Sequence, residues 1–274
     1  MTIAAGFCYK DGVLLFADSQ FTVGSTKMDG LKLGHFKRRW GSVSCAFAGN
    51  VDFASAVFQS CERSLSDSFR GDPIEALREK LGEHYKSYVL DRDSKDIDDL
   101  HYELVLGIKL QAQPARLYTT ADREFREITT FTCGGCGSDL GLVTMKHLHR
   151  TALSKEQALS LAIFTLATVK RNVDGCDGPS VLLSLEHDGR IDVFDDPKSY
   201  KAIKYIENAS EWFTNKAEQF MLTHVLGTHK EFMDRLTNLN VEALHMRDLW
   251  DGGFSPPIEL PRRSTKHDWP DPQP

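Results

Sequence analysis

The sequence predicts an α+β fold, a four-layer α-β-β-α sandwich in which helices cover two packed antiparallel sheets. Two observations lead to this prediction: strand-like and helix-like runs are segregated along the chain, and two helices follow each set of strands. In such a fold each sheet buries one face against the other sheet and its second face under helices. The 274 residues, 41% of them hydrophobic, are enough for a large core.

The first strand pair is predicted by two apolar runs around a tight turn. Residues 2–8 and 13–18 flank Lys10-Asp11-Gly12, and Asp-Gly is a frequent hairpin turn. Antiparallel pairing about this turn brings Asp18 to within a residue or two of Thr2 across the ladder. The hairpin therefore places a carboxylate beside the threonine.

The other elements follow from alternating hydrophobicity, caps and turns. Two helix starts carry the clearest signals: Asp72 followed by Pro73, and Ser154 matched by Gln157 three residues later. We expect strands over 31–36, 42–47, 102–109, 116–119, 127–132, 180–186 and 190–194, and helices over 51–69, 73–89, 139–150 and 155–172.

Three regions are expected along the chain. Residues 1–198 form the sandwich, and residues 199–254 form a helical extension because their apolar residues recur at helical spacing. Residues 255–274 are rich in proline, and we expect them to be disordered.

Composition narrows the class of protein. The net charge of −6 argues against a nucleic-acid partner. No apolar stretch approaches the roughly 18 residues of a membrane span, and no basic, apolar leader precedes Thr2, so we expect a cytoplasmic protein with no membrane partner. The six cysteines are then expected to be reduced.

Thr2 is the candidate nucleophile. A small second residue allows removal of Met1, which would leave a threonine with both a hydroxyl and a free α-amine. Such an amine has a pKa of about 7.7–8.0 and can act as the base for the hydroxyl. The alternative is an ordinary strand start, because many cytosolic proteins begin with Met-Thr.

Two further patterns bear on the site. Lys32 lies between Leu31 and Leu33, so its side chain faces away from theirs and can project toward Thr2. Cys133 and Cys136 have the spacing of a zinc or redox pair, but the sequence holds no second such pair. We therefore expect neither a metal nor a cofactor.

Four separated segments resemble proteasome β-type subunits, and most of all the peptidase of bacterial heat-shock proteases. They are residues 2–33 with KDGVLLFADSQ and TVGSTKMDG, residues 44–58 with SCAFAGNVDFASAVF, residues 133–141 with CGGCGSDLG, and residues 173–189 with VDGCDGPSVLLSLEHDG. The resemblance extends to about residue 195 and keeps the order of the family's motifs. It implies the fold of the N-terminal nucleophile hydrolases.

The resemblance also implies roles for site residues. Thr2 would be the nucleophile, and Asp18 would hold Lys32 in its charged form. The Lys32 ammonium would lie close to the Thr2 amine and lower its pKa. The Gly49 N–H would donate to the oxyanion. The loop between Gly30 and Lys32 is shorter than the family usually shows, so we match Lys32 rather than Lys27 to the family's lysine.

Three later positions belong to the same predicted site, and two of them depart from the pattern. Cys136 stands where the family has a serine between glycines, and the family's aspartate and following serine correspond to Asp174 and Asp177. A second carboxylate would favour positive charge near the amine and partly oppose the effect of the lysine.

We therefore predict a proteasome-like threonine peptidase that cleaves polypeptides. The resemblance implies a homo-oligomeric ring, with an ATP-dependent unfoldase as a candidate partner. Two alternatives stay open at this point: an amidase or acylase that uses the same nucleophile on a small amide, and a catalytically silent assembly subunit. Loss of Met1 and reaction with an inhibitor of N-terminal threonine would distinguish an active subunit from a silent one.

Overall fold

The computed structural model describes residues 2–23, 26–87, 101–121 and 124–226. The chain divides into two units, residues 1–210 and 211–274, and the second is described only as far as residue 226. No helix in these ranges is both long and apolar enough to cross a membrane.

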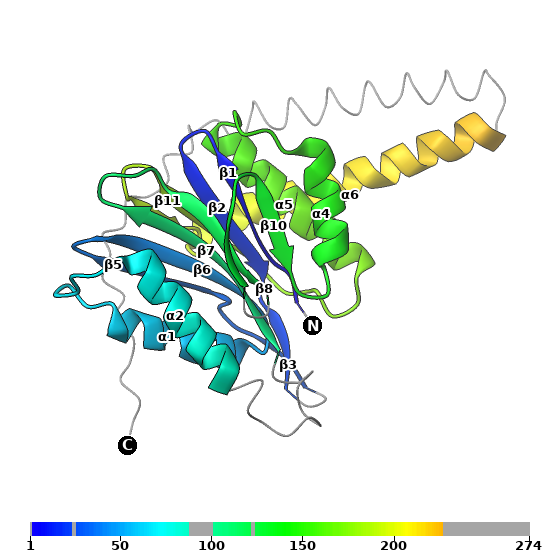
Figure 1. Cartoon of the computed structure of the whole chain (residues 1–274). Helices are drawn as coiled ribbons and strands as arrows, with labels where there is room; N and C mark the ends of the chain where they lie inside the picture. Colours follow the sequence, from blue (N-terminus) through cyan, green and yellow to red (C-terminus); the bar gives the residue numbers. More distant parts are fainter. Residues whose placement is uncertain (1, 24–25, 88–100, 122–123, 227–274) are drawn as a thin grey trace. The chain divides into compact units, whose positions relative to one another are not determined.

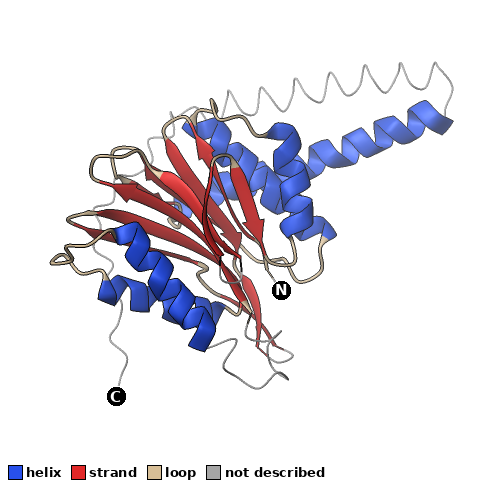
Figure 2. Cartoon of the chain, viewed as in Figure 1, coloured by secondary structure: helices blue, strands red, loops and turns tan. Residues whose placement is uncertain are grey.

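Two five-stranded antiparallel sheets form the centre of the first unit (Figure 2). Their strand orders are β10-β1-β2-β11-β12 and β5-β6-β7-β8-β9. The first sheet comprises β1 (Ala4–Tyr9), β2 (Gly12–Asp18), β10 (Phe131–Gly134), β11 (Ser180–Glu186) and β12 (Ile191–Val193). The second comprises β5 (Leu33–Arg38), β6 (Gly41–Gly49), β7 (Tyr102–Leu110), β8 (Arg116–Ala121) and β9 (Glu124–Ile128).

Helices cover the outer face of each sheet (Figure 1). The helices α1 (Val51–Ser64) and α2 (Pro73–Tyr85) contact the second sheet. The helices α4 (Ser138–Leu148) and α5 (Lys155–Asn172) contact the first. This arrangement is compatible with the predicted four-layer sandwich.

The two faces of the second sheet carry different side chains. Small and aliphatic residues face the first sheet, whereas aromatic residues pack under α1 and α2. The layer between the sheets includes Ala4, Leu15, Ala17, Ala46, Ala48, Val105, Leu117 and Leu183. The layer under the helices includes Phe36, Phe47, Phe58, Leu77, Tyr85 and Tyr102.

Both helix starts predicted from their caps are confirmed. The Asp72 carboxylate accepts hydrogen bonds from the N–H groups of Ile74 and Glu75. Ser154 and Gln157 form a reciprocal capping box at the start of α5. The predicted end of α2 at residue 89 lies outside the described residues. Helix α1 ends at Ser64 rather than at residue 69. Leu65 is its C-cap, and the Leu65 N–H donates to the carbonyl of Cys61.

One expectation about strands is wrong, and one pair of strands was not expected. The expected strand over 127–132 is in fact the end of β9 and the start of β10, which belong to different sheets. At the corner between them the Thr130 carbonyl accepts from the Cys8 N–H at 2.8 Å. The polar stretch after Asp18 also holds an unexpected two-stranded ribbon, β3 (Gln20–Val23) with β4 (Thr26–Asp29). The exposed residues of β4 lack the alternation that reveals a strand.

The boundary expected at residue 198/199 falls at the start of α6 (Pro197–Leu226). Within the first unit this helix is tied to the sandwich by Glu207, whose Oε1 accepts from Lys170 Nζ and Ser180 Oγ, each at 2.6 Å. The expected tail over 255–274 lies outside the described residues.

Candidate active site

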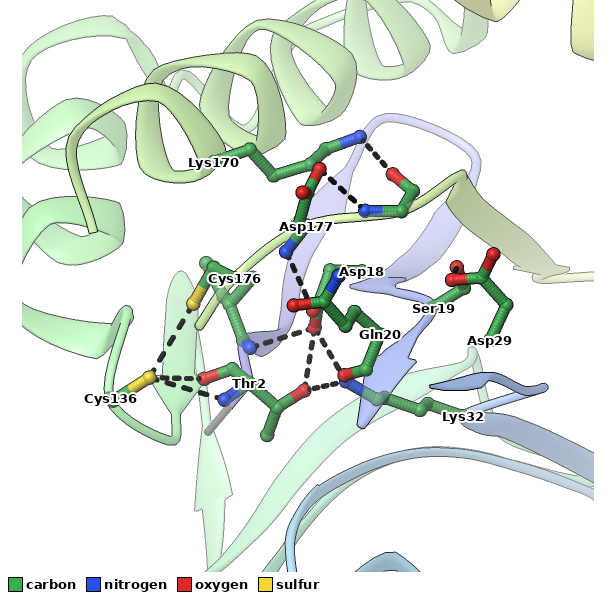
Figure 3. Close-up of polar contacts among 12 residues, drawn as sticks. Thr2, Asp18, Ser19, Gln20, Asp29, Lys32, Cys136, Lys170, Cys176 and Asp177 are labelled. Atoms are coloured by element: carbon green, nitrogen blue, oxygen red, sulfur yellow. Dashed lines mark hydrogen bonds and ion pairs between the residues drawn. The ribbon is translucent and has the colours of Figure 1, made fainter. Parts of the chain in front are cut away.

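Thr2 and Asp18 meet at the open end of the first hairpin. Because Ala4 pairs with Ala17, Ile3 and Asp18 are the next partners along the ladder. One carboxylate oxygen of Asp18, Oδ1, accepts from Thr2 Oγ1 at 2.6 Å and from the Ile3 N–H at 3.0 Å (Figure 3). Thr2 is 1% exposed and Asp18 is fully buried. The predicted proximity of Asp18 to Thr2 is confirmed.

Lys32 enters the same site from just before β5. Its Nζ lies 2.9 Å from Asp18 Oδ1 and also contacts Thr2 Oγ1 and the carbonyl oxygen of Gln20 (Figure 3). Burial lowers the pKa of the Lys32 ammonium below its usual value, and the Asp18 carboxylate opposes that shift. This lysine therefore loses its proton more readily than an exposed one.

Lys32 contacts the side chain of Thr2. We expect an ammonium close to the Thr2 amine, and Nζ donates to the hydroxyl of this same residue. The Thr2 nitrogen instead donates to Cys136 Sγ at 3.1 Å. Oγ1 of Thr2 therefore accepts from Lys32 Nζ and donates to Asp18 Oδ1.

A loop between β10 and α4 holds the backbone of Thr2. The Gly137 N–H donates to the Thr2 carbonyl at 3.3 Å, and Cys136 Sγ lies 3.4 Å from the same oxygen. Gly135 has a φ of +87°, and a Cβ there would lie 2.3 Å from the Thr2 carbonyl oxygen, so this position excludes a side chain.

Glu103 fixes this loop from the other sheet. Its Oε2 accepts from the Gly135 N–H at 2.8 Å. Our sequence reasoning did not identify Glu103. The available signal was an acidic residue inside the apolar run Tyr102–Leu110, where a carboxylate needs a partner.

Asp177 contributes its backbone to the site. Its N–H donates to Asp18 Oδ2 at 3.2 Å, and its carbonyl accepts from the Gln20 N–H at 3.1 Å. Its exposed carboxylate accepts from the Gly178 N–H at 2.7 Å. Asp174 is exposed, and in the described ranges no hydrogen bond joins it to Thr2. The geometry therefore gives no support to the expectation of a second carboxylate at the Thr2 nitrogen.

Gly49 ends β6 with a φ of +78°. A Cβ there would lie 2.3 Å from the carbonyl oxygen of His101, so the neighbouring strand requires glycine at this position. The Phe47 N–H donates to the Lys32 carbonyl at 2.9 Å. Because backbone groups alternate along a strand, the Gly49 N–H points toward the same edge, the one at which Lys32 enters.

The two thiols of the Cys133-x-x-Cys136 segment have different neighbours. Cys133 Sγ packs against Gly141 on α4, whereas Cys136 Sγ lies beside Thr2 and 3.5 Å from the sulfur of Cys176. All six cysteines are free. In the described ranges no group of three or more His, Cys, Asp or Glu side chains could hold a metal ion.

Comparison with known proteins gives the fold. No protein-family model and no curated protein matches the sequence. The structure is similar to that of Anbu, the ancestral β-subunit, from Yersinia bercovieri, with a TM-score of 0.66 and 17% identity over 80% of this chain and 96% of that one. This chain has the Anbu fold. At 17–18% identity the similarity shows the fold alone.

Two further Anbu structures agree. The Gly-1 mutant of Anbu from Hyphomicrobium sp. strain MC1 has a TM-score of 0.62 and 18% identity, over 80% of this chain and 97% of that one. Anbu from Pseudomonas aeruginosa, solved as a helical assembly, has a TM-score of 0.58 and 18% identity, over 79% of this chain and 96% of that one. The similarity covers nearly the whole length of these proteins.

We predict that Asp18→Asn destabilises the fold by about 3–5 kcal/mol, because it leaves the buried Lys32 ammonium without a counter-charge. Because the folded-state pKa of Lys32 is lowered, the native state binds fewer protons than the unfolded state between that pKa and the unfolded value. Stability therefore rises with pH across this window. In Asp18→Asn the Lys32 pKa falls further, so the rise begins at a lower pH.

Chemical denaturation at a series of pH values measures this effect. The Asp18→Asn/Lys32→Met double variant is the control. Because it has no lysine at position 32, its free energy of unfolding should not show the rise with pH that Lys32 causes. An Asp18→Asn profile parallel to that of the wild type would show that the buried pair does not control the charge of Lys32.

Proposed function

We propose that this chain is a proteasome-like peptidase with the four-layer sandwich of an N-terminal nucleophile hydrolase and Thr2 as its nucleophile. The observation that carries the proposal is the position of Thr2 Oγ1, which lies 2.6 Å from Asp18 Oδ1 and in contact with Lys32 Nζ. All three residues are at most 1% exposed. A hydroxyl held between a carboxylate and an amine is arranged for activation rather than for simple packing.

The proposed reaction begins with proton transfer from Thr2 Oγ1 to the uncharged amine of Lys32. Oγ1 then attacks the carbonyl carbon of a peptide bond and forms an ester, and water hydrolyses the ester in the second half of the reaction. The lowered pKa of Lys32 supports its role as the base, because it increases the fraction of free amine near neutral pH. Asp18 orients both groups through Oδ1.

We assign the oxyanion donor to the Gly49 N–H. The strand alternation that directs this group toward the Lys32 edge supports the assignment. A donor of this kind typically contributes about 3–4 kcal/mol to lowering the barrier. The proposed steps use side chains and backbone groups, and we propose no cofactor.

The free amine of Thr2 would arise by removal of Met1. Its contact with Cys136 Sγ would then position the amine beside the leaving group rather than beside Lys32. We propose that this amine, in its protonated form, donates the proton that the departing peptide amine requires. It takes a proton back from the water that hydrolyses the ester, and Lys32 returns its proton to Oγ1.

We predict that the purified protein lacks Met1 and forms a covalent adduct with an electrophilic inhibitor of N-terminal threonine. Thr2→Ala should form no adduct and lose turnover, because it removes the nucleophile, whereas Thr2→Ser should keep part of both. Intact mass and peptide hydrolysis are the measurements. Thr151→Ala, at an exposed threonine, is the matched control and should behave as the wild type.

Two outcomes contradict this prediction. Peptide turnover by a preparation that keeps Met1 would exclude a role for the free amine. A correctly folded protein that neither reacts with the inhibitor nor hydrolyses peptides would favour the silent assembly subunit.

We predict that Lys32→Ala slows hydrolysis by about 10²-fold or more, because Oγ1 loses its proton acceptor. In the wild type, kcat/KM should fall as the pH drops below the lowered pKa of Lys32, and this limb should be absent in the variant. Lys32→Arg should not restore activity, since a guanidinium does not give up its proton. Lys27→Ala, on the exposed strand β4, should be silent.

The pH profile of Lys32→Ala also separates the two bases. If its residual activity keeps the acidic limb, displaced upward, the Thr2 amine is the base and Lys32 only tunes it. A strong effect of Lys27→Ala with little effect of Lys32→Ala would show that Lys32 has been matched to the wrong family position.

We infer that the active form is a homo-oligomer acting on polypeptides, on the basis of the similarity to Anbu, one example of which was solved as a helical assembly. Static light scattering at micromolar concentration should therefore give a mass of many subunits. An ATP-dependent unfoldase is the partner that such an assembly would need for folded substrates. A monomer that hydrolyses small amides but not peptides would identify the amidase instead.

A further inference from the structure

Two cysteines meet beside Thr2, and neither forms a bond in the proposed reaction at Oγ1. Cys136 comes from the loop before α4, and Cys176 comes from the loop between α5 and β11. Although they are 40 residues apart in sequence, their sulfur atoms lie 3.5 Å apart (Figure 3). Cys136 Sγ also accepts from the Thr2 nitrogen.

The two thiols differ in access to solvent. Cys136 is exposed, whereas Cys176 is 1% exposed. An oxidant from solvent therefore reaches Cys136 first, and the buried Cys176 is in contact with Cys136. This is the arrangement of an attacking thiol with a resolving thiol.

The pKa shifts of the two thiols agree with an attacking role for Cys136 and a resolving role for Cys176. A hydrogen bond donated by Cys176 and another from the Thr2 nitrogen lower the pKa of Cys136 to about 6, although partial burial opposes them. Cys136 also directly precedes Gly137, the N-cap of α4, and helix N-termini favour thiolates. The pKa of Cys176 is raised, first by its hydrogen bond to Cys136 and then by burial. Cys136 is therefore the more acidic of the two thiols, and Cys176 is the less acidic.

The other four cysteines have no comparable reactivity. Burial raises the pKa of Cys8 to about 11 and that of Cys61 to about 12. Burial also raises the pKa values of Cys45 and Cys133 above the usual range. These four remain thiols near neutral pH, so an oxidant should distinguish Cys136 from them.

We propose that Cys136 and Cys176 form a peroxide-sensitive modification site that closes to a disulfide directly beside the Thr2 nitrogen. The Cys136 thiolate attacks a hydroperoxide, so an S–O bond forms as the O–O bond breaks and hydroxide or an alkoxide leaves. Sulfur is oxidised to the sulfenic acid. The Cys176 thiol then displaces water, which carries away the thiol proton, and the S–S bond forms.

Formation of the disulfide requires the two sulfur atoms to move closer together. The sulfur atoms must move from 3.5 Å apart to the bond length of about 2.05 Å. Glycines flank the moving residues: Gly135 and Gly137 lie on either side of Cys136, and Gly175 precedes Cys176. Formation of the disulfide has two local consequences for the site. The Thr2 nitrogen loses its sulfur acceptor. Movement of Cys176 also shifts the next residue, Asp177, whose N–H donates to Asp18.

The test is titration of the reduced, full-length protein with hydrogen peroxide, followed by intact mass and disulfide mapping. We expect the wild type to lose two hydrogen atoms and to yield a Cys136–Cys176 cross-linked peptide that a thiol reductant reverses. Cys176→Ser should stop at a sulfenic acid on Cys136, trapped by a dimedone probe, and Cys136→Ser should form neither product. Cys133→Ser is the matched control and should form the Cys136–Cys176 disulfide as the wild type does.

The proposal fails if peroxide converts Cys136 to sulfinic acid in the wild type without the cross-link, or if the mapped bond joins Cys136 to Cys133. It also fails if another cysteine is oxidised first. Should Cys176→Ser not fold, mapping of the wild type still decides between these outcomes. The modification does not depend on catalysis, so Thr2→Ala should form the same disulfide even if Thr2 is not the nucleophile.

Discussion

The buried pair of Lys32 and Asp18 is the constraint on which the rest of the site depends. Both side chains are fully buried, and their charged atoms lie 2.9 Å apart. Such a pair is costly to bury unless further hydrogen bonds satisfy it. Here the carbonyl of Gln20 accepts from the lysine, and the N–H groups of Ile3 and Asp177 donate to the carboxylate. The hydroxyl of Thr2 completes this network.

This network also explains why two sheets are needed. The hairpin β1–β2 supplies the threonine and the carboxylate, whereas the lysine comes from the start of β5 in the other sheet. Glu103, also from the second sheet, holds the loop that carries Cys136. The site therefore lies where the sheets pack against each other, and small residues such as Ala17 and Ala48 form part of that packing. Loss of the sheet contact would separate Thr2 and Asp18 from Lys32.

The structural similarity and the geometry of the site contribute different things to the proposed function. The similarity at 16–18% identity establishes how the chain is folded. The chemistry is argued from Thr2, Asp18 and Lys32 in this chain. Cys136 gives this site a property that the serine expected at that position would not have, because its sulfur accepts from the Thr2 nitrogen and lies 3.5 Å from a second thiol.

Local features of this protein follow from residues that are near one another in the chain. The Asp11-Gly12 turn placed Asp18 beside Thr2, and the caps at Asp72 and Ser154 started their helices, because each depends on residues close in the chain. Other features depend on how the layers pack. These are the contact of Lys32 with the hydroxyl and the backbone contribution of Asp177. They also include the placement of β9 and β10 in different sheets and the presence of Glu103 and Cys176 at the site. The physical reason is that these contacts join residues from separate strands and loops, whose positions are set by the packing of the layers rather than by their own sequence.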